Sequence, residues 1–356
     1  MASLRTTLGV LAYDLLRYVS ATRARGRWIH MRNRAEEIKF DGRGIECTLK
    51  YMSELHIANV FPKTGTRLMQ EALAQWPVSF ADAPRLEGSF PAAQSPGHPE
   101  PHRAAGQPGN RATPNPDVTF VIGHRGSSRL PHLQLTLRSI GAQQEVAIEC
   151  VVVEQAPEPE IRSALPPWVR YVHQPAQEGE PYRRAATFNE GVRRARGRLL
   201  VLHDNDLLVP ERYAAEIVAR AAESWEAMDL KRFVFYLAPR DSERVLSSGR
   251  LTLDERSDTV IQNVRGGSIA ITREAYDGIG GFDESFVGWG GEDLEFWERA
   301  ETRRATRFGY LPMIHLWHAA QPEKLQVQDA PAIKRYFELA AVPVEERIER
   351  LRRGRG

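Results

Sequence analysis

The sequence has little cysteine. Of its 356 residues only Cys47 and Cys150 are cysteines, and two such residues form neither a disulfide framework nor the ligand spacing of a zinc site. Cys150 stands in the apolar run IECVVVE, where we expect a buried, unreactive thiol. A fold stabilised by disulfides or by structural zinc is therefore not expected.

The sequence also lacks an excess of charge of one sign and a long hydrophobic run. The formal net charge is only +2, so composition gives no reason to expect nucleic acid as a partner. The N-terminal run LGVLAYDLLRYV is too short and too charged for a membrane span, and nothing resembling a cleavage site follows it. We expect a cytoplasmic protein. Basic residues cluster at both ends of the chain, so peripheral contact with the inner face of the membrane is left open as an alternative.

Composition divides the chain into four parts. Residues 92–116 are rich in proline, glycine and small polar residues without apolar periodicity, which predicts a flexible linker. We expect a small, mainly helical N-terminal unit at 1–91, a principal domain at 117–325 and a C-terminal helical tail at 326–356. The length of the chain is consistent with more than one folded unit.

The principal domain begins with alternating strands and helices. DVTFVIGHR, IECVVVEQ and RLLVLHDND predict strands, and LPHLQLTLRSIGAQ and YRRAATFNEGVRRARG predict amphipathic helices. Continuous apolar strands in this order predict an α/β fold, Rossmann-like, with a mostly parallel central sheet and helices on both faces. Ligands of such sheets bind beyond the carboxyl ends of the strands. The candidate site residues are therefore those that follow the strands: 123–125, 154–155 and 204–206.

Two acidic residues follow the third strand. Asp204 and Asp206 are separated by one residue, and oxygen ligands at this spacing can hold a divalent cation. An acidic turn that closes the strand explains the pair equally well, while the positions that a calcium EF-hand requires are missing. His315 and His318 occur late in the chain, and imidazole added to carboxylates shifts the metal preference toward Mn²⁺. Either histidine alone is explained as an ordinary core or surface residue.

A longer pattern contains these residues. In chain order it reads YRRAATFNEGVRRA, LLVLHDNDLLVP, RGGSIAITREAYDGIGGFDESFVGWGGEDLEFWERA and HLWH. Over residues 117–321 it resembles the GT-A fold glycosyltransferases of the β-1,4-galactosyltransferase kind, the bacterial chondroitin-polymerase-type enzymes and the polypeptide N-acetylgalactosaminyltransferases. The run GGFDESFVGWGGEDLEF is the specific part of the resemblance. It implies metal-dependent transfer of a sugar from a UDP-sugar to a glycan or lipid-linked oligosaccharide acceptor.

The resemblance also implies roles for individual residues. Donor and nucleotide binding is expected of Arg125, Glu154, Arg184, Asn189, Asp204, Gly266 and Gly267. Metal binding is expected of Asp206 and His318, with Asp204 and His315 as further candidates. Acceptor and sugar binding is expected of Trp289, Gly290 and Gly291, and the catalytic residues are expected to be Asp293, as the base, and Glu292.

Physical chemistry supports a catalytic carboxylate at position 293. An inverting transfer needs a carboxylate that takes the acceptor proton, and Glu292 and Asp293 stand in the first turn of a predicted helix, whose positive end favours an ionised acid. Leu294, Trp297 and Ala300 have the spacing of its buried face. The alternative is a plain N-terminal cap at Asp293. The resemblance associates aspartate at this position with inversion, and it leaves Glu292 open between acceptor binding and loop support.

Other interpretations stay open. Val264 or Arg265 stands where the resembled enzymes select the donor, so galactose and N-acetylhexosamine both remain candidates. Residues 63–66, KTGT, resemble the phosphate loop of sulfotransferases, although a helix beginning near Pro62 explains them as well. A non-catalytic nucleotide-sugar or glycan-binding module is the remaining alternative. The sequence does not predict the oligomeric state.

Overall fold

The computed structural model describes residues 62–81, 116–262, 265–306, 309–319 and 330–354. Its helices are α5 (Pro62–Gln75), η2 (Ser127–Arg129), α6 (Leu130–Gly141), η3 (Arg162–Ala164), α7 (Arg184–Arg194), α8 (Tyr213–Ala222), α9 (Pro239–Ser248), α10 (Arg273–Gly278), α11 (Glu292–Ala300), α12 (Pro331–Ala340) and α13 (Val344–Arg353). Its strands are β1 (Val118–His124), β2 (Ile148–Ala156), β3 (Val169–Pro175), β4 (Leu199–His203), β5 (Leu207–Leu208), β6 (Ala227–Met228), β7 (Lys231–Leu237), β8 (Ser257–Gln262), β9 (Ser268–Thr272) and β10 (Leu311–His315).

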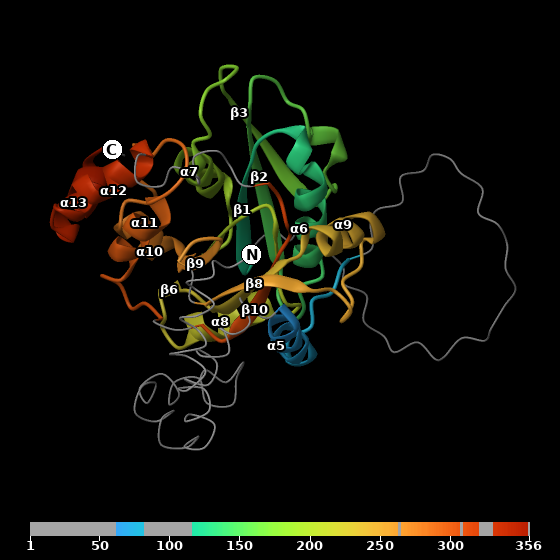
Figure 1. Cartoon of the computed structure of the whole chain (residues 1–356). Coiled ribbons are helices and arrows are strands. Elements are labelled where there is room, and N and C mark those ends of the chain that lie inside the picture. The colour runs from blue at the N-terminus through green and yellow to red at the C-terminus, as the bar shows by residue number, and fades with distance from the viewer. Residues whose placement is uncertain (1–61, 82–115, 263–264, 307–308, 320–329, 355–356) are drawn as a thin grey trace, which may run out of the picture.

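The strands form two sheets (Figure 1). The larger sheet has the order β3-β2-β1-β4-β9-β6, in which β1 to β4 run parallel while β9 and β6 are antiparallel to their neighbours. The smaller sheet has the order β5-β10-β7-β8. The predicted mostly parallel sheet is therefore confirmed, and the three predicted strands are β1, β2 and β4.

Helices cover both faces of the larger sheet, as predicted. Strand side chains alternate between the two faces, so Phe120 packs with α6 and α8 in one core cluster, and Val121 packs with α7, α10 and α11 in the other. All nine residues of β2 are buried, which explains its continuous apolar sequence. Cys150 of this strand is fully buried, and burial raises the pKa of its thiol. The expected unreactive thiol is thus confirmed.

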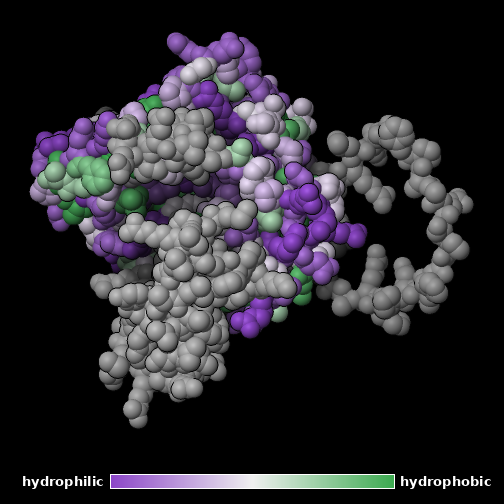
Figure 2. Space-filling view, viewed as in Figure 1, coloured by the Kyte–Doolittle hydropathy of each residue, from purple (hydrophilic) through white to green (hydrophobic). Residues whose placement is uncertain are grey.

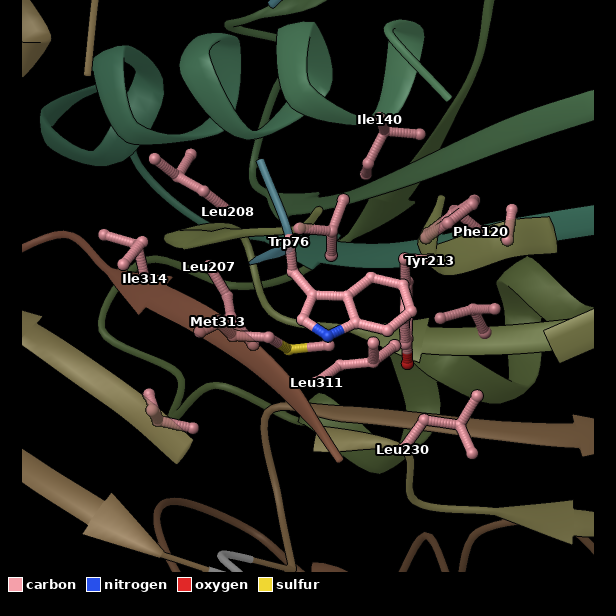
Figure 3. Close-up of a cluster of buried hydrophobic side chains, with 14 of the residues drawn as sticks. Trp76, Phe120, Ile140, Leu207, Leu208, Tyr213, Leu230, Leu311, Met313 and Ile314 are labelled. Carbon is pink, nitrogen blue, oxygen red and sulfur yellow. The ribbon is translucent and has the colours of Figure 1, made fainter. Parts of the chain in front are cut away.

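Helix α5 belongs to the main core. Figure 3 shows the indole ring of Trp76, which directly follows α5, among side chains of the sheets and of helices α6 and α8. Its labelled neighbours are Phe120, Ile140, Leu207, Leu208, Tyr213, Leu230, Leu311, Met313 and Ile314. Residues 62–81 therefore belong to the principal domain, which differs from the predicted separate unit at 1–91. Residues 1–61, Cys47 and nearly all of the predicted linker lie outside the described part of the chain.

The surface facing the viewer in Figure 2 is hydrophilic over most of the described residues, with smaller hydrophobic areas at the end of the molecule where α12 and α13 lie. None of the helices that the structure describes combines the length and apolarity needed to cross a membrane.

Candidate active site

The loop that follows β4 carries Asp204 and Asp206, and hydrogen bonds hold it on both sides. The backbone N–H of Asp204 donates to the carbonyl oxygen of Gly267 at 2.8 Å. The side-chain amide of Asn205 donates to Nδ1 of His124, at the end of β1, at 2.8 Å. His203 Nε2 donates to the carbonyl of Leu207 at 2.8 Å and closes the turn. These bonds direct the two carboxylates toward different partners.

Asp206 meets two histidines from the other sheet. His315 ends β10, and His318 follows three residues later. One ligand atom from each of the three residues lies within 4.8 Å of the others, as a metal site requires. The set comprises one carboxylate and two imidazoles, which fits a transition ion such as Mn²⁺ better than Mg²⁺. The predicted grouping of Asp206 with His315 and His318 therefore occurs in the structure.

Asp206 is a buried carboxylate surrounded by positive or proton-donating groups. Burial alone would raise its pKa, but His315, His318 and Arg129 together lower the pKa well below its usual range. Arg129 Nη1 lies 3.0 Å from Asp206 Oδ2. The sequence analysis named Arg125 as a site residue and did not name Arg129. Arg129 could have been found from its position at the start of the helix that follows β1.

Arg184, the first residue of α7, forms ion pairs with the acidic residues of the site other than Asp206. Its Nη2 lies 2.7 Å from Oδ1 of Asp204, and its Nη1 lies 2.6 Å from Oδ1 of Asp293 and 3.2 Å from Oε1 of Glu292. Asp204 lies outside the group of metal-capable residues found in the described chain, and its carboxylate pairs with Arg184. The structure therefore does not support Asp204 as a metal ligand.

Glu292 and Asp293 begin α11. The residue before the helix is Gly291, in the left-handed conformation with φ 85°, and no side chain caps this end. Asp293 lies inside the first turn, so the alternative interpretation as an N-terminal cap is wrong. The Asp293 side chain is 21% exposed and that of Glu292 only 9%. Asp293 is thus the more accessible of the two acids.

Burial and the Asp293 carboxylate raise the pKa of Glu292 to about 7, although Arg184 opposes the shift. The ordinary value is 4.5, so the folded protein binds more protons than the unfolded chain between about pH 4.5 and 7, and Glu292 destabilises the fold as pH rises through that window. Arg184 faces three acids with one positive charge, which makes a protonated Glu292 favourable. The role of Glu292, acceptor binding or loop support, stays a prediction.

We expect Glu292→Gln to raise the melting temperature of the metal-free protein at pH 8 by a few degrees and to change it little at pH 5, because glutamine carries no charge to bury. Thermal unfolding in EDTA across this pH range measures the effect. Glu243→Gln, at an exposed position of α9, is the matched control and should show no pH-dependent difference. A Gln variant whose melting temperature parallels that of wild type at every pH would contradict the raised pKa of Glu292.

Gly266 lies against the Asp293 carboxylate. A Cβ atom at this position would stand 2.1 Å from Oδ2 and 3.0 Å from Cγ of Asp293. The absence of a side chain therefore makes room for the Asp293 carboxylate, which differs from the predicted role of clearing space for the donor sugar. Gly267 has φ 86° and accepts the Asp204 hydrogen bond, so it needs glycine for its backbone conformation.

We expect Gly266→Ala to lower by about 100-fold the rate of the sugar transfer that the sequence resemblance implies, while binding of the implied UDP group persists, because the added methyl group must displace Asp293 by roughly an ångström or more. Steady-state kinetics and calorimetry of UDP binding measure the two quantities. Gly354→Ala is the matched control, since a Cβ there meets nothing closer than 3.7 Å. Wild-type turnover in Gly266→Ala would show that Asp293 does not need this clearance.

The predicted acceptor residues lie in the loop before α11. Trp289 is half-buried, and its expected sugar contact stays a prediction. Gly290 and Gly291 have φ of 106° and 85°, which require glycine. A Cβ on Gly290 would lie 2.8 Å from Cδ1 of Ile333, and one on Gly291 would lie 2.8 Å from Cβ of Tyr336. Helix α12 thus fills the space that was expected to admit a sugar.

Two predicted donor residues support loops. Glu154 is fully buried and accepts hydrogen bonds from the backbone N–H groups of Glu160 and Ile161 and from the Tyr171 hydroxyl. Asn189 is also buried, and it bonds both the carbonyl and the N–H of Phe282. The structure therefore assigns both side chains to positioning, which differs from the predicted donor contact. The contacts that bury Glu154 and Asn189 come from other segments of the chain and were not visible from sequence alone.

The remaining predictions fall elsewhere. Arg125 lies in the loop between β1 and η2, where its donor contact stays a prediction. Val264 lies outside the described residues, and Arg265 contacts Glu301 at 3.0 Å. Residues 63–66 lie within α5, where the Thr66 hydroxyl accepts a hydrogen bond from the Ser257 N–H. The helical interpretation of this segment is confirmed.

Comparison with known proteins locates the family signal in the part of the chain that carries α11. Residues 255–318 match the family described as "N-terminal domain of galactosyltransferase". No curated protein gives a significant match. Among solved structures, the mannosyltransferase PcManGT from Pyrobaculum calidifontis in complex with GDP-Man and Mn²⁺ is similar, with TM-score 0.45 and 18% identity over 81% of this chain and 75% of that chain. The family match contains Asp293, His315 and His318.

Proposed function

We propose that the chain is a metal-dependent, inverting glycosyltransferase that moves a hexose or N-acetylhexosamine, with galactose favoured, from a UDP-sugar to a hydroxyl group of a glycan. The observation that carries the proposal is the placement of two separate acids. Asp206 faces two histidines, while Asp293 lies beyond Arg184 at the start of α11. In this proposal Asp206 acts on the donor side of the site, and Asp293 acts on the acceptor.

The residues that would hold a metal are Asp206, His315 and His318. Two imidazoles beside one carboxylate suit a transition ion such as Mn²⁺ better than Mg²⁺. When bound, the ion supplies positive charge that stabilises the departing diphosphate. Arg129 lies 3.0 Å from Asp206, so its guanidinium adds a second positive charge on the same side of the site.

On the acceptor side, Asp293 takes the proton from the attacking hydroxyl. The acceptor oxygen forms a bond to the anomeric carbon as the bond from that carbon to the diphosphate oxygen breaks, and UDP leaves with the bonding electrons. Arg184 holds Oδ1 of Asp293, and Gly266 leaves room for Oδ2. Attack on the face opposite UDP inverts the anomeric configuration, so an α-linked donor yields a β-glycoside.

A panel of UDP-sugars tests this function. The protein is incubated with each donor, with and without Mn²⁺, and the release of UDP is measured. We expect at least one UDP-hexose or UDP-N-acetylhexosamine to be turned over with Mn²⁺ and none in EDTA. Absence of both turnover and binding across the panel would refute the proposal, and binding without turnover would favour a non-catalytic binding module.

A further inference from the structure

The last two helices of the described chain pack against the proposed catalytic helix. Figure 1 shows α12 and α13 beside α10 and α11, at one end of the molecule. Phe286, which lies in the loop before α11, forms a small core cluster with Ala332, Tyr336 and Leu339 of α12. The adjoining glycines of the loop lie directly against the same helix. The C-terminal segment is therefore part of the surroundings of the active site.

Ion pairs join α13 to α11, with Arg347 and Glu295 buried and Glu298 partly exposed. Arg347 has only 5% of its side chain exposed, and it lies 3.3 Å from Glu295 Oε1 and 2.8 Å from Glu298 Oε2. Glu295 is also paired with Arg299 at 2.6 Å, within a fully buried contact. Two arginines thus face two glutamates, and the charges balance. Separating α13 from α11 would leave the buried charges of Arg347 and Glu295 without these partners, which is unfavourable.

The network extends to the elements that flank α11. Arg299 donates to the carbonyl oxygens of Ile279 and Gly281, which follow α10. The Tyr336 hydroxyl of α12 donates to Glu298 Oε1 at 2.6 Å. Helix α11 is therefore held from α10, α12 and α13 together. Its remaining end, which carries Asp293, faces Arg184.

We propose that Arg347 is a positioning residue for sugar transfer: from α13 it fixes α11 through Glu295 and Glu298, and so sets the position of Asp293. Glu295 is two residues beyond Asp293 on the same short helix, so a shift at one is transmitted to the other. The inference rests on the proposed function of Asp293 as the base. It extends the active site to α13, a helix that carries neither the proposed base nor a proposed metal ligand.

Arg347→Met tests the inference in the full chain. We expect kcat for transfer to fall by about 10- to 100-fold, because misplacement of a reacting group by about 1 Å has effects of this size. UDP binding in the presence of Mn²⁺ should stay at the wild-type level, since Asp206 and its histidines lie on other elements. Arg347→Lys, which keeps the charge, should restore part of the rate. Arg350→Met removes an exposed arginine of the same helix, which pairs with Glu346, and should behave as wild type.

Hydrogen exchange gives a readout that does not depend on activity. Residues 286–297 should exchange faster in Arg347→Met than in wild type or in Arg350→Met, at a temperature where every variant is folded. If wild type transfers no sugar, the proposed function fails, and the exchange result still shows whether Arg347 holds α11. A lower melting temperature with unchanged kcat and unchanged exchange would overturn the inference. Should Arg347→Met fail to fold, Tyr336→Phe removes one bond of the same network and is expected to lower kcat in the same direction.

Discussion

Asp293→Asn is expected to lower the rate of sugar transfer by at least about 100-fold while UDP binding with Mn²⁺ stays close to that of wild type. Asparagine keeps the size of the side chain and an oxygen for the Arg184 hydrogen bond, but it cannot accept the acceptor proton. The change should therefore affect the chemical step and leave the fold and the donor site unchanged. Steady-state rates with the best donor of the UDP-sugar panel, and calorimetry with UDP, measure the two effects.

Asp277→Asn is the matched control. Asp277 is an exposed aspartate of α10 in the same segment of the chain, so its replacement should leave both quantities unchanged. Equal loss of transfer and of UDP binding in Asp293→Asn would show that the residue holds the fold of the site and is not the base. Full activity of Asp293→Asn would show that another residue is the base.

Asp206→Asn should have the second largest effect, through the metal. The change removes the carboxylate from a site in which the other two ligands are imidazoles, which add no negative charge, so the attraction for a divalent cation is largely lost. Loss of groups that merely orient a ligand already costs about 10- to 100-fold in metal affinity, and we expect loss of the ligand itself to cost at least as much. Mn²⁺ binding measured by calorimetry, and donor turnover, should both fall.

Asp254→Asn, at an exposed turn, serves as the control for this variant. Because Arg129 and the histidines also lie close to Asp206, folding is checked by thermal unfolding before the affinities are compared. Mn²⁺ affinity equal to that of wild type in Asp206→Asn would show that this aspartate is not a metal ligand. Sugar transfer that persists in EDTA would show that the reaction does not require a metal.

Local sequence patterns predicted the central strands of the fold. Continuous apolar runs placed β1, β2 and β4 correctly, and the rule that ligands bind beyond the carboxyl ends of parallel strands pointed to Asp206. The pairing of Asp206 with His315 and His318 followed from a resemblance, since more than a hundred residues separate the aspartate from the histidines. Helix periodicity placed Trp297 and Ala300 in the core correctly, but Leu294 is 43% exposed and Phe296 is buried in its place.

Contacts between distant segments were not predictable in this way. Arg184 and Asp293 are 109 residues apart, and nothing in the local sequence of either shows that the two side chains meet. Gly290 and Gly291 predicted an unusual backbone, which is confirmed, but only the structure shows that α12 occupies the space beside them. Trp76 likewise follows an ordinary amphipathic helix, whose pattern does not reveal which surface that helix covers.

The configuration of the first-formed product tests the central claim most directly. With water as the acceptor, a UDP-sugar that the protein hydrolyses in the presence of Mn²⁺ can be followed by proton NMR before the released sugar mutarotates. Asp293 acting as base on the face opposite UDP predicts that the β-anomer appears first from an α-linked donor. First appearance of the α-anomer would show retention and would contradict the assignment of Asp293.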